Sequence, residues 1–134
     1  MIKFALAKKN VVEQISIEVL YNNYLNYLSE SKSVQDYKHI LIGDSVKVIK
    51  PVFTGSGGRC TFYGFVIIHA KIVARTTFIL YYKVAYVNER TANSKPIPIH
   101  DSWRTNSVYG FDTRSTNYGI LRDDVVFGLS PQGE

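Results

Sequence analysis

The sequence predicts a mainly β fold, a small barrel or a tightly curled sheet, and three observations near the middle of the chain support it. Val46 and Val48 alternate with Lys47, which is typical of a strand with one exposed face. Residues 62–68 are almost wholly apolar, as expected for a strand buried on both faces. A glycine-rich turn, residues 54–60, separates the two strands. A curled sheet accommodates a half-exposed strand beside a fully buried one.

Length, charge and cysteine content limit the class of protein. The 134 residues are enough for one domain with a single core. A net charge of +5 favours nucleic acid or another anionic surface as a partner, while a solvated surface of mixed charge stays open as an alternative. Cys60 is the only cysteine, which excludes an intramolecular disulfide and a cysteine metal cluster. No stretch approaches the roughly 18 apolar residues of a membrane helix, so we expect a soluble protein.

The first expected element is a helix over about residues 11–29, where apolar side chains recur at three- and four-residue steps. This apolar stripe is expected to pack on the barrel, or alternatively to dock on a neighbouring protein. Asn22 and Asn23 weaken the middle of the helix because asparagine has a low helix propensity. A polar linker, residues 30–39, leads to the first strand.

Turn residues precede the first strand. Gly43 can take a positive φ, and Asp44 can accept hydrogen bonds from nearby backbone amides. The strand is expected from Ser45 to about Lys50. Pro51 cannot donate to a ladder, so it is expected to end this strand or to place it at a sheet edge.

Glycines and prolines punctuate the rest of the barrel. The segment 54–60 is expected to be a hairpin tip, and because no nucleotide-binding fingerprint follows it, we interpret its arginine as a contact to a phosphate backbone. Gly64 indicates a bend or a close backbone approach within the buried strand. The arm over residues 76–87 has two apolar faces and is expected to be deeply buried. Pro96 and Pro98 confine the following strand to an edge.

Five pieces of this pattern occur in the order, and near the spacing, of the bacterial-type ribosomal protein nineteen of the large subunit, which roughly residues 10–105 resemble. They are a Gly-Asp turn before a valine-rich strand, a glycine-tipped hairpin with an arginine, an aromatic and a glycine opening an aliphatic strand, a Thr-Phe arm ending in a basic residue, and a Pro-aliphatic-His step. Here they are Ile42, Gly43, Asp44, Val46 and Val48; Gly55 and Arg59; Phe62, Tyr63, Gly64, Phe65, Val66, Ile67 and Ile68; Thr77, Phe78, Ile79, Leu80 and Lys83; and Pro98, Ile99 and His100.

The chain departs from that family in three places. Tyr63 stands where the family has an acidic residue, and the loop before Pro98 is longer. The family's basic closing strand with paired tyrosines is replaced by residues 117–134, in which Arg122 is followed by two aspartates. Contacts that the family makes through its closing strand are therefore not carried over.

The resemblance implies an SH3-like barrel with an N-terminal α-helix and an irregular C-terminal extension, divided as residues 1–38, 39–105 and 106–134. It implies a structural constituent of the large ribosomal subunit that binds large-subunit ribosomal RNA near the subunit interface, beside neighbouring ribosomal proteins and without a cofactor, a metal or a small-molecule substrate. Scattered cations on a rigid scaffold suit such binding. The residues expected to contact RNA are Lys47, Lys50, Arg59, Arg75, Lys83, Arg90, Lys95 and Arg104.

The modest charge, the missing basic strand and a composition rich in Tyr, Ile, Asn, Lys and Phe favour a mitochondrial ribosome, with the cytoplasm of a bacterium as the alternative. Tyr81, Tyr82 and Trp103 are minor candidates for base stacking, because aromatic residues among aliphatic ones more often belong to a core.

Two other classes of function compete with this interpretation. Catalysis is not expected, because the adjacent residues His100, Asp101 and Ser102 would point to opposite faces of a strand, and the histidines lack metal-ligand spacing. The stronger alternative is a barrel used as a protein-interaction or capsid-type module, whose binding would not weaken with salt as RNA binding does. Residues 105–134 have little periodicity and are expected to order only inside an assembly.

Overall fold

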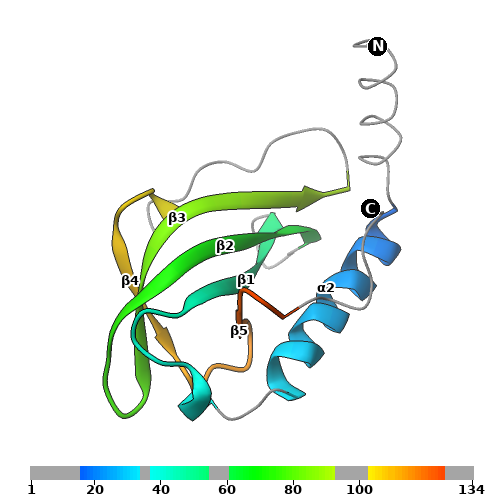
Figure 1. Cartoon of the computed structure of the whole chain (residues 1–134). Coiled ribbons are helices and arrows are strands. Elements are labelled where there is room, and N and C mark those ends of the chain that lie inside the picture. The colour runs from blue at the N-terminus through cyan, green and yellow to red at the C-terminus, as the bar shows by residue number, and fades with distance from the viewer. Residues whose placement is uncertain (1–15, 34–36, 55–60, 93–102, 126–134) are drawn as a thin grey trace.

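The computed structural model describes residues 16–33, 37–54, 61–92 and 103–125 (Figure 1). Within them lie helix α2 (Ile17–Ser33), the 3₁₀ helix η1 (Tyr37–His39) and the strands β1 (Ser45–Thr54), β2 (Thr61–Arg75), β3 (Ile79–Thr91), β4 (Val108–Asp112) and β5 (Gly119–Arg122). The strands form one sheet in the order β4-β3-β2-β1-β5, and every neighbouring pair is antiparallel. No helix in the described residues is both long and apolar enough to cross a bilayer.

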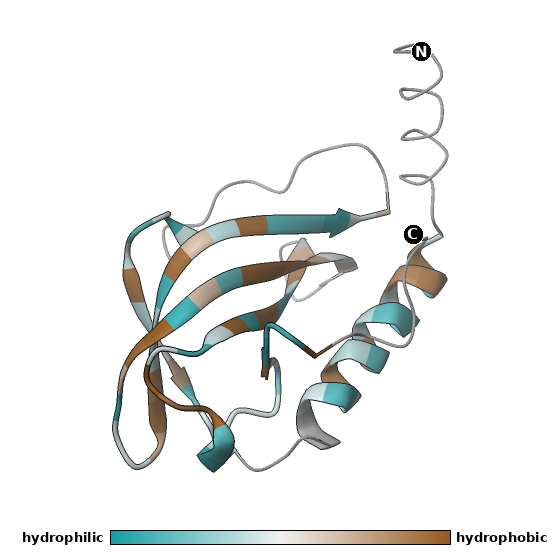
Figure 2. Ribbon diagram, viewed as in Figure 1, coloured by the Kyte–Doolittle hydropathy of each residue, from teal (hydrophilic) through white to brown (hydrophobic). Residues whose placement is uncertain are grey.

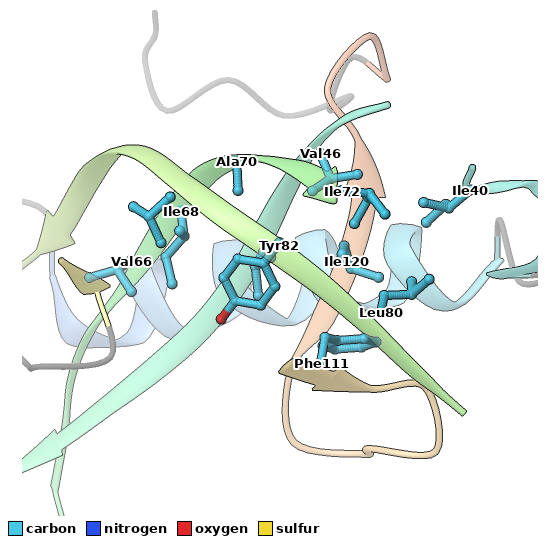
Figure 3. Packing of buried hydrophobic residues seen from close by; sticks show 12 residues of the cluster. Ile40, Val46, Val66, Ile68, Ala70, Ile72, Leu80, Tyr82, Phe111 and Ile120 are labelled. Carbon is cyan, nitrogen blue, oxygen red and sulfur yellow. The ribbon is translucent and has the colours of Figure 1, made fainter. Parts of the chain in front are cut away.

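The sheet curls until its two outermost strands share one core. Phe111 of β4 and Ile120 of β5 belong to the same buried cluster as Val46, Ile68 and Tyr82 of the central strands (Figure 3). Because β4 and β5 lie at opposite ends of the strand order, only a curved sheet brings their side chains together. The predicted fold class is confirmed as a half-barrel. Its inner face carries this cluster, and the opposite side of the sheet is called the outer face below.

Strand β2 is buried on both faces, as its apolar sequence predicts. Val66 and Ile68 point into the inner cluster, whereas Phe65 and Ile67 belong to a second buried cluster on the outer face. The alternation follows from the two-residue period of a strand. The burial of consecutive residues on the two faces makes β2 the centre of the fold.

Helix α2 covers part of the outer face, so the prediction that its apolar stripe packs on the barrel is confirmed. Tyr24 and Tyr27 place their rings 5.6 and 5.5 Å from the ring of Phe65. The Tyr24 hydroxyl donates to the Asn117 carbonyl, and burial raises the pKa of Tyr24 to about 12. The Ser31 hydroxyl donates to the carbonyl oxygen of the β5 residue Ile120 at 3.1 Å. These bonds join the helix to the C-terminal part of the chain.

The helix begins with an N-cap. The Ser16 hydroxyl accepts a hydrogen bond from the backbone N–H of Val19 at 3.2 Å, which satisfies one of the free amides of the first turn. Glu18 places a negative charge in the same turn, where the helix dipole favours it. The expected start near residue 11 lies outside the described residues, and the helix continues to Ser33, past the expected end near Ser29.

The turn before β1 forms as predicted. Gly43 has a φ of 98°, and the Asp44 carboxylate accepts a hydrogen bond from the backbone N–H of Leu41 at 2.9 Å. The prediction that β1 ends near Lys50 is wrong, because the strand continues to Thr54. Its alternative is confirmed, since β5 pairs with β1 only as far as Ile49 and no other described strand lies beside Pro51 on that side.

Gly64 lies where β2 and β3 approach closely, as the sequence indicates. A Cβ atom at this position would overlap the carbonyl oxygen of Arg90 and lie 3.1 Å from the Cα of Thr91. Both are backbone atoms of the neighbouring strand, which a paired ladder holds in place. Glycine is therefore required here by the spacing of the strands rather than by its φ angle.

Replacing Gly64 by alanine is expected to lower the free energy of unfolding by about 1–3 kcal/mol, because the methyl group forces two paired strands apart. Gly110→Ala is the matched control, since its methyl group would meet only side-chain atoms of Ile79 and Tyr81, at 3.1 and 3.4 Å. Urea unfolding of the two variants measures the difference. Equal destabilisation would contradict the assignment of the close approach to the β3 backbone.

Two expectations about the remaining strands are wrong. The arm that contains β3 is not deeply buried on two faces: Leu80 and Tyr82 are buried on one face, but Lys83 on the other face is exposed. Phe78, which precedes the strand, retains 48% of its accessible surface. Residues 106–134 are not irregular throughout, since they supply β4 and β5. These short strands form because Phe111, Ile120 and Leu121 complete the two buried clusters, so the expected boundary at residue 105 falls inside the sheet. The expected edge strand at Pro96 and Pro98, the hairpin tip with Arg59, and Lys95 lie outside the described residues.

Candidate nucleic-acid interface

Helix α2 packs on only part of the outer face. Beyond Ile67, which the helix covers, the next outer-face residues of β2 are His69 and Lys71. Opposite them on β3 lie Tyr86 and Lys83. We call this surface the open outer patch; its members are His69, Lys71, Lys83, Tyr86 and Val108, the β4 neighbour of Lys83. Figure 2 shows that β3 is hydrophilic toward its arrowhead, the end of the strand at Thr91.

Lys71 and Lys83 form a like-charge pair in the centre of the patch. They stand directly opposite each other in the β2–β3 ladder, and both side chains are exposed. Among the described residues, neither makes an ion pair. Like charges directly opposite each other destabilise a sheet. The fold therefore maintains a concentration of positive charge that a bound anion would relieve.

His69 and Tyr86 form an aromatic stack beside the lysines. Their ring centroids are 4.2 Å apart and the ring planes differ by 11°. His69 Nδ1 lies 3.1 Å from a carboxylate oxygen of Asp123, and its Nε2 lies 3.0 Å from the side-chain nitrogen of Asn88. Because an amide nitrogen only donates and a carboxylate only accepts, this arrangement fits a neutral imidazole with its proton on Nδ1. Both ring nitrogens of His69 therefore have a hydrogen-bond partner, and the Tyr86 ring, which is 53% exposed, stacks on an imidazole whose orientation is fixed.

Two other predicted RNA contacts lie on the outer face. Lys47 is the β1 neighbour of His69, and its ammonium donates to the Val125 carbonyl at 2.7 Å. Burial lowers the pKa of Lys47, while Asp123 and Asp124 act in the opposite direction. Arg90 lies farther along β3, where its guanidinium donates to the neighbouring carbonyl of Glu89 at 3.0 Å. Lys47 and Arg90 therefore lie on the same face as the open outer patch but outside it, whereas Lys83 belongs to it.

The remaining predicted contacts lie elsewhere. Lys50 points to the inner face, with its ammonium 4.9 Å from the centre of the Tyr118 ring. The guanidinium of Arg75 donates to the carbonyls of Tyr37 and Ile40, and so fastens the segment before β1 to the end of β2. Arg104 is exposed in the loop before β4. The structure thus gives Arg75 a role in the fold and gathers only part of the predicted set on one surface.

Lys50 gives a prediction about pH. Burial lowers its pKa below the ordinary value of 10.5, so the folded state disfavours the charged form relative to the unfolded state. This cost is present at neutral pH and disappears as the pH rises through the folded pKa toward 10.5. The stability of the wild type relative to Lys50→Met should therefore increase from neutral to alkaline pH, measured by urea unfolding of both proteins. A decrease would show that attraction to the Tyr118 ring outweighs burial.

Lys71, His69 and Tyr86 belong to this surface but were not among the residues predicted to contact RNA. Lys71 faces Lys83 because the β2–β3 pairing is irregular between Ile72 and Ala74, and a second irregularity, between His69 and Ala70, restores the original register at His69 and Tyr86. Counting residues outward from the hairpin turn does not reproduce the pairing of Lys71 with Lys83. Among the aromatic residues considered for stacking, Tyr82 is fully buried, so that prediction is wrong. Tyr81 and Trp103 are half-buried, and Trp103 packs against the inner cluster.

No family model, curated protein or solved structure matches the chain. Within the described residues, no group of three or more His, Cys, Asp or Glu side chains is placed to hold a metal ion.

Proposed function

We propose that the chain is a structural, non-catalytic constituent of the large ribosomal subunit, of a mitochondrial ribosome rather than a bacterial one, that binds large-subunit ribosomal RNA through the open outer patch. The like-charge pair of Lys71 and Lys83 supports this proposal most directly, because its charges lack a described protein partner and are exposed on a rigid sheet. RNA is held largely through phosphates and shape, which requires fixed cations rather than a catalytic group.

The shape of the patch favours an extended polyanion over a small anion. Sites for small molecules are usually concave, with convergent polar groups. The patch instead lies on the outer face of a curled sheet, which is its convex side, and its two lysines emerge from neighbouring strands. A nucleic-acid backbone can contact both lysines and continue past Lys47 and Arg90 on the same face.

Sedimentation of a native lysate tests this proposed function. Gradient fractions collected at low and at high salt are analysed for this chain by mass spectrometry. Co-migration with the large ribosomal subunit, maintained at moderate salt, is the expected result. Migration as a free small protein, or in a complex without RNA, would contradict the ribosomal role.

A protein-interaction module is the second candidate, and helix α2 provides the observation that favours it. Ile17, Tyr21 and Leu25 recur every four residues on its outer side, and their exposed fractions are 43, 41 and 39%. Phe53, which is 52% exposed, contacts the Phe62 ring, which Tyr21 also contacts. A partner held by this apolar surface would stay bound at high salt, unlike RNA. In a ribosome the same surface would face a neighbouring protein.

A further inference from the structure

We propose that Tyr86 is a stacking platform for one unpaired base of RNA, and that Lys71 and Lys83 bind the phosphates beside that base. The inference rests on the proposed RNA-binding function and specifies the kind of RNA that the open outer patch recognises. It concerns a single-stranded loop or bulge rather than a continuous duplex.

The platform is already assembled in the free protein. One face of the Tyr86 ring is covered by His69 at 4.2 Å, and the imidazole is fixed by Asp123 on one nitrogen and by Asn88 on the other. The 53% exposure of Tyr86 leaves its remaining surface to solvent. A ring held in this way loses little conformational freedom when a ligand stacks on it, which favours binding.

The lysines are placed to hold the backbone of the stacked nucleotide. Lys71 is two residues from His69 on the same face of β2, a separation of about 7 Å at roughly 3.3 Å per residue. Lys83 stands directly across the ladder from Lys71. Both side chains are long and flexible, with three N–H donors on each ammonium group. One nucleotide can therefore contact the Tyr86 ring with its base while its phosphates contact Lys71 and Lys83.

The geometry selects an unpaired base. Inside a duplex, each base is stacked on its neighbours on both faces, so its ring is not accessible to a protein side chain. An aromatic residue on an open sheet surface can stack only on a base that has left the helix or was never paired. Stacking also explains why an exposed tyrosine lies among lysines, because it adds sequence-tolerant contact to phosphate binding.

The test uses the full chain with Tyr86→Leu and, as the matched control, Tyr86→Phe, which keeps the ring. The probes are a short single-stranded oligouridine that carries one 2-aminopurine and an RNA duplex of the same length. Tyr86→Leu is expected to lower the affinity for the single strand about ten-fold and to abolish the change in 2-aminopurine fluorescence that stacking produces. Tyr86→Phe is expected to match the wild type, and all three proteins to bind the duplex equally. Circular dichroism melts confirm that the variants fold.

The other outcomes separate this inference from the proposed function. Failure of the wild type to bind either RNA would overturn both. Salt-dependent binding of the wild type, with Tyr86→Leu unchanged or equally weakened toward both probes, would overturn the stacking platform alone. Weaker co-sedimentation of Tyr86→Leu with the large subunit, at unchanged affinity for the single strand, would assign Tyr86 to a protein neighbour and would also overturn it.

Discussion

Replacing Phe65 by alanine is expected to lower the free energy of unfolding by about 3–5 kcal/mol, a large part of the stability of a domain of this size. Phe65 has no exposed surface and lies under Tyr24 and Tyr27, so its loss leaves a cavity between the helix and the sheet. Urea or thermal unfolding measures the change. Because the cavity lies where helix α2 packs on the sheet, far-ultraviolet circular dichroism should also report a loss of helix before the sheet unfolds.

Phe53→Ala is the matched control for this prediction. It removes the same side chain from the same sheet, but Phe53 is 52% exposed and meets the Phe62 ring in a T-shaped arrangement with the centroids 5.7 Å apart. A loss of less than about 1.5 kcal/mol is expected, because most of its area is already in water. Equal effects of the two substitutions would mean that helix α2 does not bury Phe65 as described.

Neutralising the lysine pair is expected to have the largest effect on binding. The double variant Lys71→Gln/Lys83→Gln should bind large-subunit ribosomal RNA roughly 10- to 30-fold more weakly near 0.15 M salt, because two phosphate contacts and their released counterions are lost. The slope of log affinity against log salt should decrease by about two. Filter binding over a range of salt concentrations measures both quantities.

The same variant is expected to gain stability while it loses affinity. Removing two like charges that face each other across a ladder should raise the free energy of unfolding by about 0.2–1 kcal/mol. Lys38→Gln/Arg114→Gln is the control for RNA binding, since it makes the same change in net charge at exposed positions outside the patch. If this control weakens RNA binding as strongly, net charge rather than the patch determines affinity. Lower stability of the lysine variant would contradict the repulsion argument.

The parts of the fold that local chemistry determines could be predicted from the sequence. The turn at Gly43 and Asp44, the close approach at Gly64 and the two buried faces of β2 each follow from a few adjacent residues. Strands β4 and β5 could not be predicted, because they are short and are held by partners far away in the sequence. Their burial depends on the curvature of the complete sheet, which no short window of sequence contains.

The candidate site was predictable only in outline. A basic surface on a barrel follows from the composition, and Lys83 belongs to the patch. The direct pairing of Lys71 with Lys83 requires the shifted register that follows the irregularity between Ile72 and Ala74. His69 and Tyr86 stack where a second irregularity has restored the register of the turn. The opposite error concerns Arg75, whose charge suggested a phosphate contact but whose guanidinium is hydrogen-bonded to two backbone carbonyls.

The strand order also determines when the protein can finish folding. Strands β1, β2 and β3 pair in sequence order, but the two borders of the sheet are completed by β4 and β5, which are synthesised after the other described strands. Until residue 112 has emerged during synthesis, β3 lacks its β4 partner. Until residue 122 has emerged, β1 lacks its β5 partner, and helix α2 lacks the β5 surface on which Ser31 is anchored. Unpaired edges are the surfaces through which chains aggregate. A partner that binds the nascent chain early would therefore protect it during this interval.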